Sequence, residues 1–345
     1  MGCYKNGLVI TGGASGIGAA TVKAALARGW PVAFCDVLAR DRIDPSLLTD
    51  RSLYVEANVA KPDQMALFRD STIRSFTERG MMPERLNVVA CAGISRRGDP
   101  DQVRLMKDIN EGGTFNLLYS FANDIPSGRG LFVGLSSIVA AEGIAVKGDE
   151  EYKTTKVEAM RIATEEAGGL GCQGFAVAPG AIDTPMTRHE AIFGMLLLGA
   201  ARTFGGNAAH RLNSEVLGLA GIRACTSPAV VLKALLGPAL TESKDFRIVS
   251  ETFEKDPLLA MSGVLRFVAW LNPKGADGQR HVRPEAIERS AEVLARLDVV
   301  IGPDVVARLM LDQLESSAVP EGGLLRAYSA NGENRITELM GAFAA

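Results

Sequence analysis

The stretch TGGASGIG, residues 11–18, is the part of the sequence that decides the fold. It follows an apolar, β-branched run, GLVIT at 7–11, and it opens a helical pattern. Gly12 permits a tight turn, while Gly16 and Gly18 let the backbone and the helix approach a pyrophosphate closely. The anion would sit at the amino-terminal end of the helix, where free N–H groups point outward. A glycine cluster in this strand–turn–helix context predicts nucleotide binding.

Further short apolar runs alternate with helical stretches along the chain. They are almost continuously apolar rather than alternating, which is typical of parallel strands covered on both faces. The pattern predicts right-handed βαβ units in a Rossmann-like, doubly wound α/β sheet of about seven strands. The expected strands are 7–11, 31–36, 52–58, 86–92, 131–136, 174–179 and 322–329, and the expected helices are about 17–30, 62–79, 100–124, 151–168 and 302–316.

The pattern changes between residues 188 and 300. This stretch is rich in helix-like sequence and contains two long apolar runs, at 191–201 and 258–271. Both are too short to cross a bilayer, so no transmembrane segment is expected. We therefore expect one Rossmann-like domain built from residues 1–187 and 301–345, with 188–300 as a helical insertion.

The composition excludes several classes of function. Apolar residues make up 47% of the chain and charged residues 22%, which indicates a globular core rather than disorder. The formal net charge of −3 provides no basic field for nucleic acid. The five cysteines lack CxxC spacing and the three histidines lack metal-ligand spacing. We therefore expect a cytoplasmic protein without a metal site.

Asp36 predicts the kind of nucleotide. It ends the second expected strand, 18 residues after Gly18. A carboxylate at this place accepts hydrogen bonds from a ribose diol and repels a 2′-phosphate. The glycine turn and the residues directly after Asp36 contain no Arg or Lys that could hold such a phosphate. The sequence therefore predicts NAD rather than NADP.

The stretch YKTTK places Tyr152 and Lys156 four residues apart, on one face of an expected helix. Alone, this spacing also fits two solvated side chains. Hydride transfer between an alcohol and a nicotinamide needs a proton acceptor at the oxygen, but a free tyrosine has a pKa near 10. A neighbouring ammonium group favours the phenolate and so lowers that pKa. The pair is thus a candidate acid/base.

Taken in order, these motifs resemble those of the compact, single-domain branch of the short-chain dehydrogenase/reductase family. The family carries TGxxxGxG, an Asn-Asn-Ala-Gly-like turn, a helix Asn, a Ser after the fifth strand, YxxxK and a Pro-Gly turn. This chain has, in that order, TGGASGIG, ACAG at 90–93, Asn110, Ser137 in LSSIVA, YKTTK and PGAIDTP at 179–185. The resemblance covers roughly residues 7–187 and 302–332.

The resemblance implies roles for four catalytic residues. Tyr152 is the acid/base, and Lys156 lowers its pKa and bonds the nicotinamide ribose. Ser137, which aligns better than Ser136 with the family's serine, polarises the substrate oxygen. Asn110 helps to order a proton-relay water that leads to Lys156.

The resemblance also implies a set of cofactor contacts. Asn58 and Val59 stand where the family often has Asp-Val beside the adenine, and Thr184 follows the Pro-Gly turn near the carboxamide. Ala90 and Cys91 depart from the family by replacing both asparagines of the turn. The expected contacts are Gly12, Ser15, Gly16, Ile17, Gly18, Asp36, Val37, Asn58, Val59, Ala92, Gly93, Tyr152, Lys156, Pro179, Gly180, Ile182 and Thr184.

The sequence thus predicts an NAD-dependent oxidoreductase that interconverts a secondary alcohol and a ketone. A carbonyl reductase or epimerase that uses the same residues is the alternative within enzymes. A non-catalytic NAD-sensing scaffold is the alternative from another class. The Ser137–Tyr152–Lys156 set argues against the scaffold, since binding NAD alone needs no tyrosine base.

The insertion and two helices carry predictions about substrate and assembly. The insertion begins just after Thr184, beside the expected nicotinamide site, so we expect a helical cap over a hydrophobic, cyclic or long-chain small-molecule substrate. The alternative is a segment that serves oligomerisation or membrane contact. Residues 114–122 and 157–167 carry more apolar surface than one sheet face needs. In resembling proteins these helices form a dimer interface, so a homodimer or homotetramer is expected.

Overall fold

The computed structural model describes residues 4–95, 99–141, 150–182, 184–186 and 300–327. Nearly all of them belong to one compact unit of the chain, residues 1–186 and 302–328. The predicted insertion lies outside the described residues, except for Val300. Its helical structure and its role as a cap therefore stay predictions.

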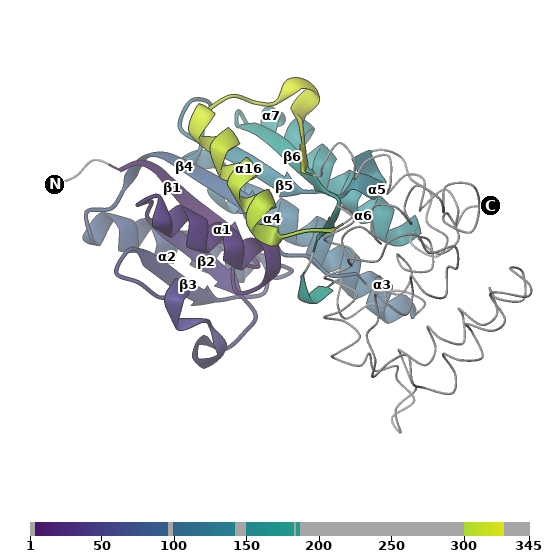
Figure 1. Ribbon diagram of the computed structural model, residues 1–345, viewed down its shortest axis with the longest axis horizontal. Coiled ribbons are helices and arrows are strands. Elements are labelled where there is room, and N and C mark those ends of the chain that lie inside the picture. The colour runs from purple at the N-terminus through teal and green to yellow at the C-terminus, as the bar shows by residue number, and fades with distance from the viewer. Residues whose placement is uncertain (1–3, 96–98, 142–149, 183, 187–299, 328–345) are drawn as a thin grey trace, which may run out of the picture. The chain divides into compact units, whose positions relative to one another are not determined.

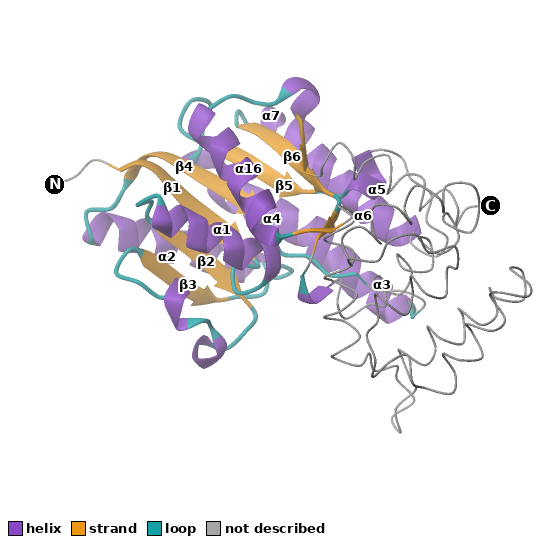
Figure 2. Ribbon diagram, viewed as in Figure 1, coloured by secondary structure: helices purple, strands orange, loops and turns teal. Residues whose placement is uncertain are grey.

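Seven parallel strands form one sheet in the order β3-β2-β1-β4-β5-β6-β9. Figures 1 and 2 show β1 to β6 lying side by side in it. The predicted Rossmann-like, doubly wound sheet is thus confirmed. Because all seven strands are parallel, the loops that follow them leave at the same edge of the sheet, and the strand order reverses between β1 and β4. The strands are β1 (Tyr4–Thr11), β2 (Val32–Asp36), β3 (Ser52–Glu56), β4 (Pro83–Ala90), β5 (Leu131–Leu135), β6 (Gln173–Pro179) and β9 (Leu324–Ala327). Two short strands, β7 (Ala181–Ile182) and β8 (Val300–Ile301), are not part of this sheet.

Helices cover the sheet. Figure 1 shows α1 and α16 side by side over the strands, although they lie at opposite ends of the sequence. The helix α2 packs against α4. The α-helices of the described part are α1 (Gly16–Ala27), α2 (Pro62–Glu78), α3 (Pro100–Lys107), α4 (Gly113–Phe121), α5 (Ile138–Ala141), α6 (Glu150–Arg161), α7 (Ala167–Gly169) and α16 (Pro303–Ser316). None of the helices described is long and apolar enough to span a membrane.

Two helices expected to be continuous are each interrupted by a π-helical turn. Residues Asp108–Gly112 form one between α3 and α4, and residues Ile162–Glu166 form the other between α6 and α7. A π-turn inserts an extra residue into the ladder of helix hydrogen bonds and re-aims the side chains within it. The first turn contains Asn110, whose side chain bonds outside its own helix, and the apolar periodicity carries no sign of this.

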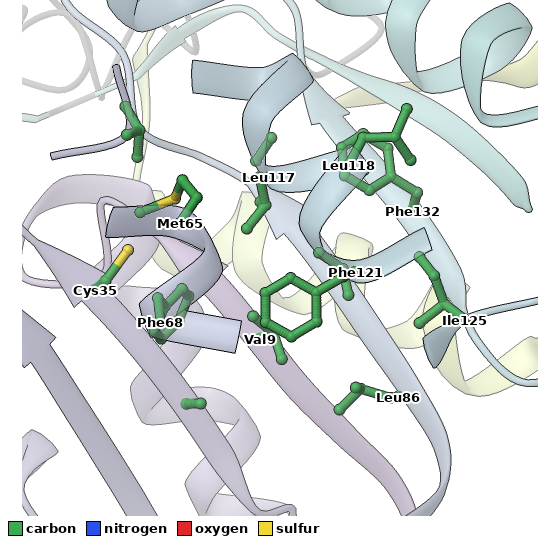
Figure 3. Close-up of a cluster of buried hydrophobic side chains, with 14 of the residues drawn as sticks. Val9, Cys35, Met65, Phe68, Leu86, Leu117, Leu118, Phe121, Ile125 and Phe132 are labelled. Atoms are coloured by element: carbon green, nitrogen blue, oxygen red, sulfur yellow. The ribbon is translucent and has the colours of Figure 1, made fainter. Parts of the chain in front are cut away.

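The core beneath α2 and α4 is built from aromatic and aliphatic side chains. Figure 3 shows Phe68 of α2 and Phe121 of α4 packed over strand residues that include Val9 and Leu86. The rings of Phe68 and Phe121 meet edge to face, with centroids 5.9 Å apart. Such a pair contributes about 0.5–1.5 kcal/mol beyond its buried area. This packing holds the helix that carries the Asn110 turn against the sheet.

The last helix returns to the start of the chain. Apolar residues of α16, among them Met310 and Leu311, are fully buried, and α16 lies against α1. Arg28, which caps α1, forms an ion pair with Asp312 at 2.5 Å. The next strand, β9, starts later than expected because residues Glu321–Gly323 form a 3₁₀ turn. The edge strand beside β6 is thus formed by residues that follow the insertion.

Candidate active site

The carboxyl ends of β1, β2 and β4 meet at one edge of the sheet. Thr11, the last residue of β1, pairs with Cys35 of β2 on one side and with Ala90 of β4 on the other. The loops that follow these strands therefore leave the sheet together. In open α/β sheets this is the edge at which ligands bind.

The glycine loop after β1 has the geometry expected of a pyrophosphate cradle. Gly12 and Gly16 have φ angles of +66° and +53°, a region that side chains disfavour. A Cβ on Gly18 would lie 2.0 Å from the carbonyl oxygen of Gly12. Ser15 stands at the N-cap of α1 without a side-chain capping bond, and the first turn, which includes Ile17, has no acidic residue. The N–H groups of the helix start can therefore face an anion.

Asp36 is tied to this loop. Its carboxylate accepts hydrogen bonds from the backbone N–H of Ala14 at 3.2 Å and of Val37 at 2.8 Å. The hydroxyl of Tyr54 donates to the carbonyls of Asp36 and Leu38, which fixes the backbone around the carboxylate. Val37 is 65% exposed. The carboxylate thus lies next to the glycine loop, where a nucleotide ribose would be placed.

Asn58 and Val59, expected beside the adenine, have local partners. The side-chain oxygen of Asn58 accepts a hydrogen bond from the backbone N–H of Ala60 at 2.9 Å. The backbone N–H of Asn58 donates to the side-chain oxygen of Gln64 in α2. Val59 is buried, and a Cβ on Gly113 would lie 2.5 Å from its side chain. These residues therefore anchor α2 and α4. A role of Asn58 toward adenine would use the lone pair that its amide oxygen retains.

Thr11 supports the turn after β4, and the sequence reasoning missed it. Its hydroxyl oxygen accepts from the N–H groups of Cys91 and Ala92, both at 3.2 Å. Thr11 thus holds the backbone of this turn, in which Ala90 and Cys91 stand where the family usually has two asparagines. Burial of the sulfur raises the pKa of the Cys91 thiol to about 12, so the thiol is protonated at neutral pH and is a weak nucleophile. A hydroxyl-bearing residue at the strand end was the only sequence signal for this contact.

Asn110 is held by two further elements of the fold. Its side-chain oxygen accepts from the N–H of Ile94 at 2.9 Å, and its NH₂ group donates to the carbonyl of Ile94, also at 2.9 Å. The same NH₂ group donates to the hydroxyl of Thr155 in α6 at 3.0 Å. The residue is 1% exposed. The π-turn is thus joined to the loop after β4 and to the helix that carries Tyr152.

The ammonium group of Lys156 lies beside Gly93, as the side-chain oxygen of Asn110 does. Its Nζ donates to the carbonyl of Leu135 at 3.1 Å and lies 5.7 Å from the centre of the Tyr152 ring. A Cβ on Gly93 would lie 3.2 Å from this Nζ and 3.3 Å from the side-chain oxygen of Asn110. Burial lowers the pKa of Lys156 from 10.5 to about 8. At pH 7 most molecules therefore still carry the ammonium charge beside Tyr152.

The two adjacent serines do different things. The hydroxyl of Ser136 donates to the carbonyl of Lys156 at 2.8 Å, and this side chain is buried. Ser137 is half-buried, and its oxygen accepts a long hydrogen bond from the N–H of Val139 at 3.4 Å. Ser136 is thus bound to α6, and Ser137 keeps a hydroxyl proton that it can donate. Of the two serines, Ser137 is the more exposed.

The Pro-Gly turn after β6 completes this edge. Pro179 pairs with Ala327 of β9, and the N–H of Gly180 donates to the carbonyl of Ala327 at 3.3 Å. Ile182 is buried. The methyl group of Thr184 would lie 3.4 Å from a Cβ on Gly16, so Thr184 adjoins the glycine loop. Gly16 and Thr184 are thereby neighbours, although they are far apart in the sequence.

A family model described as short chain dehydrogenase matches residues 6–192. The chain belongs to the short-chain dehydrogenase/reductase family, a family of oxidoreductases that bind a nicotinamide cofactor, NAD or NADP. The glycine cradle and the Asp36 carboxylate fit such a dinucleotide.

Two curated relatives are dehydrogenases. The chain is 28% identical over 185 residues to the 3-alpha-(or 20-beta)-hydroxysteroid dehydrogenase of Mycobacterium tuberculosis, covering 52% of this chain and 70% of that protein. It is 29% identical over 196 residues to the 2,5-dichloro-2,5-cyclohexadiene-1,4-diol dehydrogenase of Sphingobium indicum, covering 53% of this chain and 74% of that protein.

Solved structures resemble the chain over a similar span. A short-chain dehydrogenase/reductase from Serratia marcescens covers 57% of this chain and 82% of its own length, with 24% identity and a TM-score of 0.48. The structure of ElxO with NADP bound covers 53% of this chain and 75% of its own length, with 23% identity and a TM-score of 0.45.

Proposed function

We propose that this protein is an NAD-dependent dehydrogenase that oxidises a hydrophobic secondary alcohol to a ketone. The observation that carries the proposal is the position of Lys156. Its buried ammonium group lies beside the Tyr152 ring, next to Gly93 and Asn110. It bonds the last residue of β5, at the edge of the sheet where the glycine loop follows β1. A scaffold that only bound a nucleotide would have no need to bury a lysine at that cost.

In the proposed reaction, Tyr152 takes a proton from the substrate and Ser137 donates a hydrogen bond to it. Tyr152, as phenolate, accepts the proton of the substrate hydroxyl, and the charge of Lys156 stabilises the phenolate. Ser137 donates a hydrogen bond to the same substrate oxygen. Bound NAD supplies the acceptor for the hydride that leaves the carbinol carbon. Asn110 holds the loop around Gly93 and orders the proton path to Lys156.

Asp36 supports NAD over NADP. Its carboxylate is held against the glycine loop by the N–H of Ala14. A negative charge at that position accepts hydrogen bonds from a free ribose diol and repels a 2′-phosphate. The three residues that follow, Val37, Leu38 and Ala39, offer no positive charge.

The relatives support the substrate class. Both act, by their names, on hydroxyl groups of ring compounds, one a steroid and the other a chlorinated cyclohexadiene diol. We extend this to a hydrophobic, ring-containing alcohol for this protein. The apolar runs between residues 188 and 300 would provide an apolar lining for the binding site of such a substrate.

We further propose a cytoplasmic homo-oligomer. The rings of Phe115 and Tyr119 in α4 lie in contact, with centroids 4.4 Å apart and planes tilted by 34°, and the two residues are 37% and 53% exposed. Paired exposed aromatics are common in the centres of interfaces. Light scattering at micromolar concentration should give at least twice the chain mass of 36.6 kDa, and a monomer would refute this part of the proposal.

The central test is absorbance of NADH formed from NAD with a panel of cyclic secondary alcohols. We expect turnover with at least one alcohol, and a higher kcat/KM with NAD than with NADP. Tyr152→Phe keeps the ring and should bind NAD while its turnover falls by about 100-fold or more. A Phe variant with more than about a tenth of the wild-type rate would exclude Tyr152 as the base, and a wild type that is inactive on every alcohol and ketone would favour a scaffold.

A further inference from the structure

We propose that Thr155 is a positioning residue that locks the side-chain amide of Asn110 and ties it to the Tyr152–Lys156 turn. This inference rests on the proposed function for its kinetic consequences. It begins from a hydrogen bond that joins two elements distant in sequence, the π-helical turn Asp108–Gly112 and α6. Thr155, in α6, is completely buried and directly precedes Lys156.

The hydroxyl of Thr155 makes two hydrogen bonds of opposite sense. It donates its proton to the carbonyl of Tyr152 at 2.8 Å. Its oxygen accepts from the NH₂ group of Asn110 at 3.0 Å. Because the only hydroxyl proton is committed to the Tyr152 carbonyl, the oxygen can serve the asparagine only as an acceptor. Thr155 therefore requires the nitrogen of the Asn110 amide, and not its oxygen, to face α6.

The orientation of this amide decides what faces the lysine. With its NH₂ group bound to Thr155 and to the carbonyl of Ile94, the amide directs its oxygen to the N–H of Ile94. That oxygen adjoins Gly93, on the side where the ammonium group of Lys156 also lies. A rotated amide would place its N–H groups toward the ammonium and toward a second donor, which is unfavourable. Thr155 and the backbone of Ile94 thus together hold the amide so that its oxygen, and not its NH₂ group, lies on the side of Lys156.

A second buried threonine supplies a matched control. Thr72 is also completely buried, and its hydroxyl donates to the carbonyl of Phe68 at 2.8 Å, one turn earlier in α2. Thr→Val at either position removes a hydroxyl and keeps the shape of the side chain. Both substitutions should lower stability, and Thr155→Val should lower it more, because it also leaves the buried NH₂ group of Asn110 without one of its acceptors. Only the change at Thr155 should reach Asn110.

The first experiment needs neither cofactor nor substrate. The unliganded protein, labelled with ¹⁵N only in asparagine, gives the solvent exchange rate of the Asn110 side-chain NH₂, assigned with Asn110→Ala. In Thr155→Val this exchange should be at least about tenfold faster than in the wild type, since a hydrogen bond of the NH₂ group is lost. Thr155→Ser keeps the hydroxyl and should stay within about twofold of the wild type, and so should Thr72→Val.

The second experiment uses the alcohol found for the wild type. Thr155→Val should lower kcat by about tenfold or more while the KM for NAD changes less than about twofold. The half-maximal pH of kcat should rise, because a displaced lysine stabilises the Tyr152 phenolate less. Thr155→Ser should restore both values, and Thr72→Val should leave both unchanged.

Each result decides the proposal. Unchanged Asn110 exchange in a folded Thr155→Val protein would overturn it, and so would kinetic losses of equal size in Thr72→Val. If Thr155→Val has no cooperative melting transition, Thr155→Ala is compared with Thr155→Ser by the same two measurements. A wild type without activity on any alcohol refutes the proposed function, while the exchange experiment still decides the role of Thr155.

Discussion

The two halves of the candidate site are built in different ways. The half after β1 consists of backbone: Gly12, Gly16 and Gly18 remove side chains so that N–H groups can approach an anion. The half around α6 consists of buried polar side chains, chiefly Asn110 and Lys156, that hydrogen-bond across elements distant in sequence. The first half depends on the absence of side chains, and the second depends on hydrogen bonds that hold polar side chains in fixed positions.

This difference predicts different responses to substitution. A glycine loop fails through steric overlap, which a small side chain already causes. A polar network fails through unsatisfied donors, charges and orientation, so its response depends on which atom is removed and on pH. The following predictions test this contrast, beginning with the largest effect.

Gly18→Ala should abolish measurable NAD binding and lower the free energy of unfolding by about 2–3 kcal/mol. The new Cβ would lie 2.0 Å from the carbonyl oxygen of Gly12, which is backbone and cannot rotate away. Gly168→Ala is the control, because a Cβ there meets nothing within 4 Å. Its unfolding free energy should be unchanged or higher by up to about 1 kcal/mol. NAD titration and urea unfolding measure both, and normal NAD affinity in Gly18→Ala would contradict the cradle.

Ser137→Ala and Ser136→Ala should separate chemistry from support. Ser137→Ala should lower kcat by about 100-fold, because it removes a donor to the reacting oxygen, with little change in stability. Ser136→Ala removes the hydrogen bond to the Lys156 carbonyl. It should cost about 1 kcal/mol of stability and much less activity. Steady-state kinetics and thermal unfolding of both variants check this, and the reverse pattern would reassign the serine.

The stability of the unliganded protein should depend on pH through Lys156. The folded pKa of about 8 lies below the ordinary 10.5, so between these values the unfolded chain binds more protons and stability rises with pH. The wild type should therefore gain up to about 3 kcal/mol relative to Lys156→Met between pH 7.5 and 10.5. Below pH 7.5 the difference between the two proteins should stay constant. Urea unfolding at a series of pH values gives this difference, and a flat profile would show that the lysine is not buried as described.

Asp36→Ala should produce the smallest effect, a shift of the ratio of kcat/KM for NAD to that for NADP by about tenfold toward NADP. The substitution removes both the acceptor for the ribose diol and the repulsion of a 2′-phosphate. It also removes the hydrogen bond from Ala14, so a modest loss of stability is expected. Kinetics with both cofactors give the ratio. An unchanged ratio would leave Asp36 with a structural role in the loop alone.

Local requirements could be predicted from the sequence because they depend on few residues. The sheet, the glycine turn and the helices α1, α2 and α16 follow from apolar runs and from glycine positions. The catalytic roles followed only from the resemblance, since YKTTK alone fits a solvated surface. The π-turn at Asn110 could not be predicted, because it is fixed by hydrogen bonds to Ile94 and Thr155, which lie in other elements.

The sequence by itself determined that this chain folds as a doubly wound α/β sheet with a nucleotide cradle after its first strand. Periodicity and backbone freedom are properties of neighbouring residues, so a linear pattern suffices to predict them. Only the tertiary structure decided that Ser136 binds the Lys156 carbonyl, that Thr11 supports the turn at Cys91, and that Asn110 bonds the hydroxyl of Thr155. These contacts satisfy buried polar groups across separate strands and helices, and the partner of a buried donor is set by packing rather than by its place in the sequence.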